Sequence, residues 1–408
     1  MAMATKLSIK ALYKIFGERG DEAMRLIESG KTKDEILAET GATVGVNDVS
    51  VDIEEGEIFV VMGLSGSGKS TLIRMLNGLI APTSGTITID GDDIAHCSDE
   101  KIREIRRQKI SMVFQHFALF PHKTILENAA FGLKIKGVGV AERNERARKS
   151  LAQVGLEQYA DSYPEQLSGG MQQRVGLARG LAAEPQVLLM DEPFGALDPL
   201  IRRDMQEELL ELQRSLGKTI VFITHDLNEA LILGDKIAIM KGGRFVQVGT
   251  AEEIVGSPAD AYVEAFTKDI DRSRVFPAQR VAKPAEALQK ADLVAPSALS
   301  AMERLGRDAI YVVENGKPVG VLRYRDAQGA LQNAGGDCLS ALVTSFPKAD
   351  RKKPIFELYP LARKGLPIAI VDDADQLIGV VEPETIFAEL AGDDETVEEE
   401  AALKTAAE

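Results

Sequence analysis

The sequence predicts an α/β fold with a largely parallel sheet in the first two thirds of the chain, followed by a smaller module of two repeats. Three observations support this fold class. Short apolar runs (IFVVMG, GTITID, ISMVF, QVLLMD, TIVFIT and KIAIM) alternate with longer stretches of helical pattern. The glycine-rich segment GLSGSGKST at residues 63–71 stands between one such run and a helical pattern. After a linker at residues 271–280, the stretches 308–331 and 366–390 each show the pattern of strand, turn, short strand and helix.

Composition narrows the class of protein. The chain has 408 residues and a formal net charge of −15, a balance that argues against a general nucleic-acid binder. Its two cysteines, Cys97 and Cys338, lack the close spacing of a disulfide framework or a zinc site. No apolar run reaches the roughly 20 residues that span a bilayer, and the N-terminal segment lacks a signal-peptide core. We therefore expect a cytoplasmic chain that meets a membrane only through a partner.

The segment GLSGSGKST has the context of a Walker A phosphate-binding loop, because it follows the strand pattern IFVVM and precedes the helical pattern TLIRMLNGL. Its glycines let successive backbone N–H groups turn toward phosphate oxygens at a helix N-terminus. Lys69 can reach the β- and γ-phosphates, and the Ser70 hydroxyl can bind Mg²⁺. The predicted nucleotide-binding residues of the loop are Gly63, Ser65, Gly66, Ser67, Gly68, Lys69, Ser70 and Thr71.

Acidic and polar residues follow three further strand patterns. Asp191 and Glu192 end the run VLLMDE, so we expect Asp191 on the Mg²⁺ side of the triphosphate and Glu192 beside the attacking water, as general base. His225 follows TIVFIT and Gln115 follows ISMVF, and parallel strands open on one crevice at their carboxyl ends. We expect His225 to contact the γ-phosphate and Gln115 to contact the metal and the water. Each has a structural alternative: solvated acids at a strand end, a structural histidine, or a turn glutamine.

These motifs occur together in one order. GLSGSGKST, MVFQ with Gln115, LSGGM, LLMDEP, GALD and His225 have the order and spacing of ATP-binding cassette (ABC) transporter ATPases. The resemblance covers about two thirds of the chain. It implies an ABC-type P-loop NTPase domain with a helical subdomain that binds ATP and Mg²⁺ and hydrolyses ATP.

The segment LSGGM resembles the ABC signature sequence. The resemblance implies that Ser168, Gly169 and Gly170 bind the γ-phosphate of an ATP molecule held by a second subunit, and that Asp198 crosses the same interface. Because the chain carries one cassette, we expect a homodimer of this subunit. The family more often has serine where Gly195 stands. The structural alternative is a glycine-rich helix start without a ligand.

Phe16 in LYKIFG matches the position at which the family stacks an aromatic ring on adenine. A phenylalanine ring suits that role because it offers a flat apolar face. Tyr13 is the competing candidate, and a core position is the structural alternative for Phe16.

The segment after Phe16, residues 17–50, contains an insertion with two amphipathic helical patterns, AMRLIESG and KDEILAETG. Together with MGLSGSGKSTLIRMLNGLI and FALFPHKTILENAAFGL, it resembles the ATPase of glycine betaine/proline betaine importers. This resemblance implies an integral membrane permease, whose coupling helix meets the stretch from His116 to Leu133, and an extracytoplasmic substrate-binding protein. It places the chain at the cytoplasmic face of the cell membrane as a peripheral subunit.

The repeated stretches resemble tandem CBS domains. We expect the ABC domain at residues 1–275, the CBS domains at residues 276–335 and 336–390, and a disordered acidic tail at residues 391–408.

The CBS-like repeats depart from the nucleotide-binding pattern, in which Thr or Ser precedes Asp by three residues. Arg323 stands before Asp326 in the first repeat, and Glu382 stands before Thr385 in the second. Because a carboxylate beside a phosphate is unfavourable, the pattern favours sensing of another signal, or dimerisation, over binding of an adenosine ligand.

Three other functions are alternatives for a chain with these motifs. An ABC ATPase that imports another small solute fits all of them. A soluble ABC ATPase outside transport would show two cassettes or a long coiled-coil insertion, and the sequence has neither. A phosphate-loop kinase or GTPase would leave LSGGM unexplained, and the guanine-reading pattern NKxD is absent from the sequence.

Overall fold

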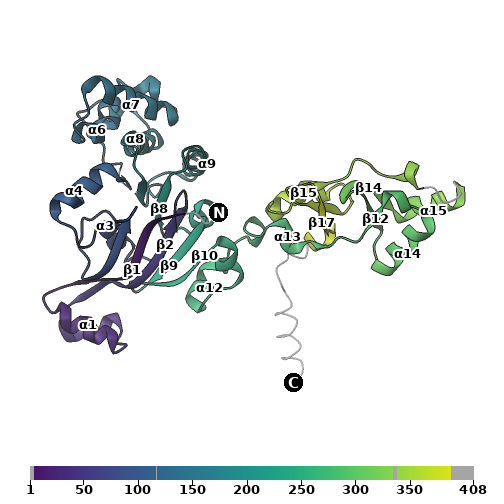
Figure 1. Ribbon diagram of the computed structural model, residues 1–408, viewed down its shortest axis with the longest axis horizontal. Coiled ribbons are helices and arrows are strands. Elements are labelled where there is room, and N and C mark those ends of the chain that lie inside the picture. Colours follow the sequence, from purple (N-terminus) through teal and green to yellow (C-terminus); the bar gives the residue numbers. More distant parts are fainter. Residues whose placement is uncertain (1–3, 116, 334–337, 387–408) are drawn as a thin grey trace. The chain divides into compact units, whose positions relative to one another are not determined.

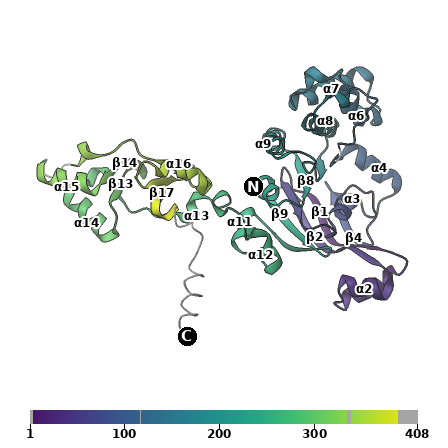
Figure 2. The same ribbon diagram turned by 180° about the vertical axis from the view of Figure 1, so that it is seen from behind.

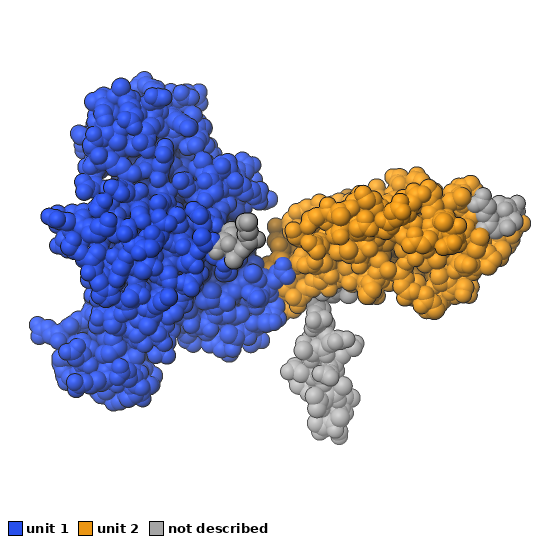
Figure 3. Space-filling model, viewed as in Figure 1, with its two compact units in different colours: residues 1–269 blue, residues 270–408 orange. Residues whose placement is uncertain are grey.

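The computed structural model describes residues 4–115, 117–333 and 338–386 and divides the chain into two compact units. Unit 1 covers residues 1–269 and unit 2 covers residues 270–408 (Figure 3). The division lies close to the predicted end of the first domain. The predicted acidic tail lies outside the described residues.

Unit 1 is built around a six-stranded sheet (Figure 1). Its strands pair parallel except at one edge, where β10 pairs antiparallel with β9, so the predicted α/β class is confirmed. The central strands β3 and β8 are buried along their whole length, which suits continuous apolar runs covered on both faces. In order across the sheet, the strands are β10 (Arg244–Gly249), β9 (Lys236–Lys241), β3 (Ile58–Met62), β8 (Thr219–Thr224), β7 (Val187–Asp191) and β6 (Ile110–Phe114).

A second sheet of unit 1 is antiparallel, and it contains GTITID, one of the six apolar runs from which a largely parallel sheet is predicted. Only alternate residues of this run, Ile87 and Ile89, are buried, as in a strand with one covered face. The order of this sheet is β2 (Thr43–Glu54), β1 (Thr5–Phe16), β4 (Ser84–Ile89) and β5 (Asp92–Asp93).

One hydrophobic core joins the two sheets through helix α3 (Lys69–Leu76). It includes Leu7 of β1, Phe59 of β3, Leu72 of α3 and Ile87 of β4, each almost fully buried. The loop that connects β3 to α3 is therefore anchored at both ends to the most buried part of unit 1.

Two groups of helices lie at opposite ends of unit 1 (Figures 1 and 2). The inserted helices α1 (Gly20–Glu28) and α2 (Lys33–Thr40) match the two helical patterns expected after Phe16. The other group is α5 (Ile125–Ala129), α6 (Phe131–Ile135), α7 (Val140–Gln153) and α8 (Gly169–Ala182). The remaining helices are α4 (Asp99–Gln108), α9 (Pro199–Leu216), α10 (Leu227–Leu233), α11 (Ala251–Gly256) and α12 (Ala261–Thr267).

Unit 2 contains two similar arrangements, each a short strand, a helix and an antiparallel hairpin whose first strand pairs parallel with the short strand. The predicted repeat covered the hairpins but not the strand and helix before them, because three-residue strands carry too little pattern to detect. The first arrangement is β12 (Ala287–Gln289), α14 (Ala295–Leu305), β13 (Ala309–Glu314) and β14 (Lys317–Arg323), followed by α15 (Tyr324–Asn333). The second is β15 (Lys348–Asp350), α16 (Tyr359–Ala362), β16 (Ile368–Val371) and β17 (Leu377–Val381).

The two arrangements of unit 2 are interlocked. Strand β11 (Lys283–Pro284), which follows helix α13 (Ala278–Val281) and precedes the first arrangement, pairs with β17 of the second. The Tyr311 hydroxyl on β13 donates to the Pro367 carbonyl oxygen at 2.6 Å, and the Pro347 carbonyl oxygen lies 3.2 Å from the same hydroxyl oxygen. Across the described parts of both units, no helix has the length and apolarity needed to cross a bilayer.

Candidate active site

The loop after β3 depends on glycine at two positions. Gly63 and Gly68 have φ angles of 153° and 113°, which residues with a side chain rarely adopt. A Cβ atom at Gly63 would lie 2.2 Å from the Met240 carbonyl oxygen, and one at Gly68 would lie 2.4 Å from the Gly45 carbonyl oxygen. The loop therefore lies directly on the backbone of neighbouring strands, and α3 begins at Lys69 immediately after it.

Two buried polar side chains of this loop are suited to an anionic ligand. Lys69 is only 5% exposed, and its Nζ donates to the carbonyl oxygens of Gly63, at 2.7 Å, and Leu64, at 3.1 Å. Burial lowers the pKa of Lys69, while Glu192 and Asp191 oppose that shift. Among the described atoms, the buried hydroxyl of Ser67 has no hydrogen-bond partner. Phosphate oxygens would supply the acceptors that both groups can use.

A cavity of about 630 Å³ brings most of the predicted nucleotide site together. It contains the phosphate loop together with Phe16, Glu192 and His225 from separate elements, and Tyr13 is not part of its lining. Lys33 of the inserted helix α2 also lines it, and no sequence motif had indicated that residue. The lining consists of Phe16, Lys33, Thr43, Gly45, Leu64, Ser65, Gly66, Ser67, Gly68, Lys69, Ser70, Thr71, Glu192 and His225.

The structure separates the two candidates for the adenine-stacking ring. Phe16 ends β1 with 39% of its surface exposed, and the Lys14 Nζ lies 5.1 Å from its ring centroid. Tyr13 instead packs on the hydrophobic cluster formed by the inserted helices and the adjacent strands. Phe16 is thus the aromatic ring that a ligand in the cavity can reach.

Glu192 and His225 form a pair at the ends of neighbouring strands. Glu192 Oε2 and His225 Nδ1 are 3.0 Å apart, in hydrogen-bond contact. The Glu192 backbone has a φ angle of 46°, and its N–H donates to the Ile223 carbonyl oxygen at 3.0 Å. Asp191 ends β7, and burial, followed by the Glu192 charge, raises its pKa.

Gln115 lies beside Gly195, so the MVFQ and GALD motifs meet. A Cβ atom at Gly195 would lie 3.2 Å from the Gln115 Nε2. A side chain at position 195 would therefore require the Gln115 amide to shift slightly.

The signature residues lie outside the cavity of their own chain. Ser168 is the N-cap of α8, and its hydroxyl accepts a hydrogen bond from the Met171 N–H at 3.4 Å. Asp198 is the N-cap of α9 and accepts from the Ile201 N–H at 3.1 Å. A Cβ atom at Gly170 would lie 2.5 Å from Ile201 Cγ2, so the two helix starts are in close contact. None of Ser168, Gly169, Gly170 and Asp198 lines the cavity that contains the phosphate loop.

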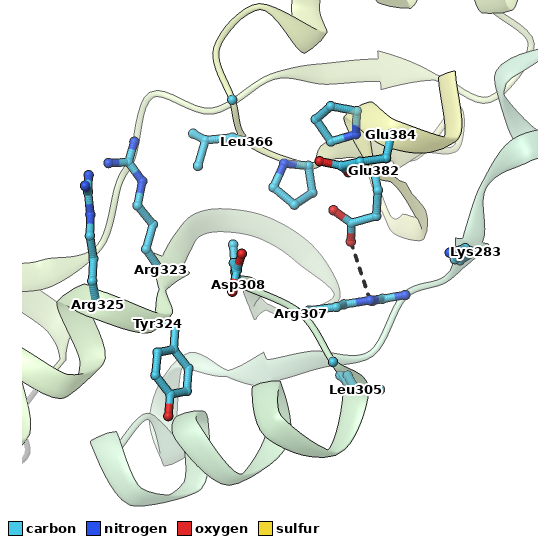
Figure 4. Close-up of a pocket in the computed structure, with 15 residues that line it drawn as sticks. Lys283, Leu305, Arg307, Asp308, Arg323, Tyr324, Arg325, Leu366, Glu382 and Glu384 are labelled. Atoms are coloured by element: carbon cyan, nitrogen blue, oxygen red, sulfur yellow. Dashed lines mark ion pairs between the residues drawn. The ribbon is translucent and has the colours of Figure 1, made fainter. Parts of the chain in front are cut away.

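Unit 2 has a cavity of its own, of about 690 Å³, between its two arrangements (Figure 4). Arg323, at the predicted hydroxyl position of the first repeat, and Glu382, at that of the second, both line it. Glu382 Oε1 lies 3.5 Å from Arg307 Nε, and burial raises the pKa of Glu382 while Arg307 opposes the shift. Asp326 and Thr385 are not among the lining residues.

The chain matches known proteins over nearly its whole length. The family model for ABC transporters matches residues 46–195. The chain is 50% identical over 398 residues to the glycine betaine transport ATP-binding protein OpuAA of Bacillus subtilis, an alignment that covers 97% of this chain and 94% of that protein. It is 51% identical over 385 residues to the glycine betaine/proline betaine transport system ATP-binding protein ProV of Escherichia coli, covering 93% and 96% respectively.

Solved structures resemble unit 1. CbiO1 from Clostridium perfringens, part of an ABC transporter complex, matches with a TM-score of 0.53 and 28% identity, covering 62% of this chain and 92% of that chain. An ATP-binding cassette dimer in a post-hydrolysis state, bound to ADP and Pi, matches with a TM-score of 0.50 and 35% identity, covering 60% and 98%. These likenesses confirm the predicted resemblance: the chain belongs to the ABC transporter family, in the group of glycine betaine transport ATP-binding proteins.

Proposed function

We propose that this protein hydrolyses ATP to power the import of glycine betaine, proline betaine or a similar quaternary amine across the cell membrane. One observation carries the proposal: a single cavity contains the phosphate loop, the exposed ring of Phe16 and the hydrogen-bonded pair Glu192 and His225. These groups can hold a nucleoside triphosphate and activate a water molecule at its end. The transported amine is inferred from the names of relatives that are 50% and 51% identical.

In the proposed reaction, a water oxygen bonds to the γ-phosphorus while the bond from that phosphorus to the β–γ bridging oxygen breaks. Glu192 accepts the proton that the water loses, and its hydrogen bond to His225 holds the carboxylate in place. His225 contacts the γ-phosphate. Lys69 and the loop N–H groups neutralise the charge on the β- and γ-phosphates. The products are ADP and phosphate.

Mg²⁺ is the proposed cofactor. Ser70, Gln115 and Asp191 offer hydroxyl, amide and carboxylate oxygens, which are the donors that Mg²⁺ prefers. Within the described residues, no group of three or more His, Cys, Asp or Glu could hold a metal ion. Phosphate oxygens and water would therefore complete the coordination, and the metal would neutralise charge on the transferred phosphate when bound.

The proposed active form is a homodimer. Ser168, Gly169 and Gly170 lie outside the cavity of their own chain, which supports their proposed role at the γ-phosphate held by a second copy. Asp198 at the adjacent start of α9 would cross the same interface.

A groove on unit 1 supports the proposed contact with a membrane permease. It has a volume of about 530 Å³ and is lined by Phe131 and Ile135 of α6 and by arginines of α4. Ile135 is 54% exposed, so the groove offers a coupling helix both apolar and cationic side chains. It overlaps the predicted contact stretch from His116 to Leu133, whose first residue lies outside the described part of the chain. A peripheral position at the cytoplasmic face of the membrane, with an extracytoplasmic substrate-binding protein as third component, follows from this proposal.

Unit 2 is proposed to be a tandem CBS module with a regulatory or dimerisation role. The repeated order of short strand, helix and hairpin supports this proposal, with the two domains at residues 276–335 and 336–390. Glu382 lines the cavity between the repeats, and its carboxylate would disfavour a nucleotide phosphate there, which supports a role other than nucleotide binding.

Transport in cells tests the proposal. The chain is expressed with its permease and binding protein in cells that lack osmoprotectant uptake, and accumulation of labelled glycine betaine is measured with unlabelled proline betaine, carnitine and choline as competitors. We expect uptake that disappears in Glu192→Gln. ATP hydrolysis by the purified chain without uptake or competition by any quaternary amine would show that it serves a different solute.

A further inference from the structure

The inserted helix α2 brings a second lysine into the nucleotide cavity. Lys33 is the first residue of α2, and its side chain lines the cavity that also contains Phe16, Lys69 and Glu192. Lys33 precedes Lys69 by 36 residues in the sequence, so the two ammonium groups come from separate helices, α2 and α3.

The Lys33 side chain has no partner of its own among the described residues, where it makes neither an ion pair nor a hydrogen bond. Burial lowers its pKa, with Asp34 opposing the shift, so the ammonium is partly shielded from water. A partly buried cation without a partner gains free energy when an anion enters the same cavity.

The position of Lys33 is fixed by local structure. Thr32 caps α2 in a capping box with Glu35, whose carboxylate accepts from the Thr32 N–H at 2.7 Å. The helix packs through Ile36 on a hydrophobic cluster that includes Ile15 of β1 and Val44 of β2. The lysine therefore extends from a helix that is capped and packed on unit 1.

The chemistry of the cavity selects the phosphate chain as the partner of Lys33. The Lys33 ammonium can donate three hydrogen bonds and can accept none, and phosphates are the charged acceptors of a nucleotide. We propose that Lys33 binds the phosphate chain of the bound nucleotide, as a second cation beside Lys69 supplied by the inserted helix. The inference rests on the proposed function, because it takes ATP as the ligand of this cavity.

Nucleotide binding to the purified full-length chain tests the inference. Displacement of a fluorescent ATP analogue is measured with MgATP, MgADP and adenosine for the wild type and for Lys33→Met. We expect about tenfold weaker binding of MgATP and MgADP, as for loss of one charge-assisted hydrogen bond, and unchanged binding of adenosine. Lys33→Arg should restore most of the affinity, because it keeps the charge.

Lys31→Met is the matched control. Lys31 lies two residues earlier, pairs with Glu39 and does not line the cavity, so its loss should leave nucleotide binding unchanged. Equal MgATP affinity in Lys33→Met and the wild type would overturn the inference, as would an equal loss for MgATP and adenosine. If the wild type itself fails to bind MgATP, the proposed function fails, and the inference fails with it.

Discussion

Among single residues, Glu192 combines an unusual backbone with two defined contacts. Its φ angle of 46° lies in the left-handed region, a conformation that costs of order 1 kcal/mol or more for a residue with a side chain. The N–H bond to Ile223 and the side-chain contact with His225 hold it there. Glu192 is thereby held in place in the lining of the nucleotide cavity.

Replacing Glu192 with Gln should separate nucleotide binding from hydrolysis. The amide keeps the size of the side chain but cannot accept the water proton, so we expect the steady-state rate of phosphate release to fall about 100-fold or more. MgATP affinity should stay within a few-fold of wild type. Glu207→Gln is the control, since Glu207 is exposed and pairs with Arg203 on the surface of α9. A rate close to wild type for Glu192→Gln would reject the general-base assignment.

Single residues also show where sequence reasoning stops. The phosphate loop, Glu192 and His225 could be predicted to lie together because strand ends and a glycine loop carry recognisable patterns. Phe16 was added by the resemblance to the ABC family. Lys33 could not, because a lysine at the start of an exposed helix is ordinary in sequence. The helical pattern KDEILAETG predicted the helix, but only the fold of the insertion shows that its first residue, Lys33, lines the cavity.

At the scale of elements, the N-termini of α8 and α9 form one surface. Ser168 and Asp198 cap the two helices, and Gly170 allows their first turns to touch. The motif LSGGM predicted a helix start, and the structure adds that α9 packs against it. The separate antiparallel sheet that contains GTITID could not be predicted, since strand direction depends on pairing partners that are distant in the chain.

Gly170→Ala should destabilise this contact between helices. The added methyl group would lie 2.5 Å from Ile201 Cγ2, and the β-branched isoleucine has little rotamer freedom in a helix. We expect a loss of about 1–3 kcal/mol in the free energy of unfolding, measured by urea denaturation. The control is Gly169→Ala, where the nearest atoms are 3.9 Å away. Equal stability of both variants would show that the two helix starts can separate freely.

Ser168→Arg should prevent productive dimer closure. An arginine side chain would project from the start of α8 into the space expected for the partner's γ-phosphate, while the phosphate loop of the same chain stays intact. We expect ATP hydrolysis near background and MgATP binding within a few-fold of wild type. The double variant Ser168→Arg with Glu192→Gln should form no ATP-dependent dimer in a light-scattering measurement. Because Ser168 caps α8, thermal unfolding of the variant is measured alongside. A dimer as stable as that of Glu192→Gln alone would contradict the composite site.

At the scale of the whole molecule, the predicted functions are divided between the two units. Every predicted catalytic and nucleotide-binding residue lies in unit 1, which has its own hydrophobic cores. The boundary and the presence of a repeat could be predicted from the linker and the similar stretches. The interlocking within unit 2 could not, because β11 has only two residues and pairs with a strand almost a hundred positions later.

A chain that ends at residue 269 should retain ATP binding and hydrolysis. We expect a cooperative unfolding transition and a phosphate-release rate within a few-fold of the full chain, because the nucleotide cavity and its supporting core are complete in unit 1. The same chain with Lys69→Ala is the control for contaminating ATPases. Loss of hydrolysis in a folded, ATP-binding truncated chain would show that unit 2 is needed for the reaction itself.

The pairing of β11 with β17 also affects how this gene can change. A stop codon between the two hairpins of unit 2 would delete β16 and β17, and the segment that leads into the first repeat would lose its ladder partner. The remaining hairpin would expose the apolar face around Tyr311, which now packs on Ala369 and Val380. Loss of the second repeat alone would therefore destabilise the first, so the two repeats depend on each other as one folding unit.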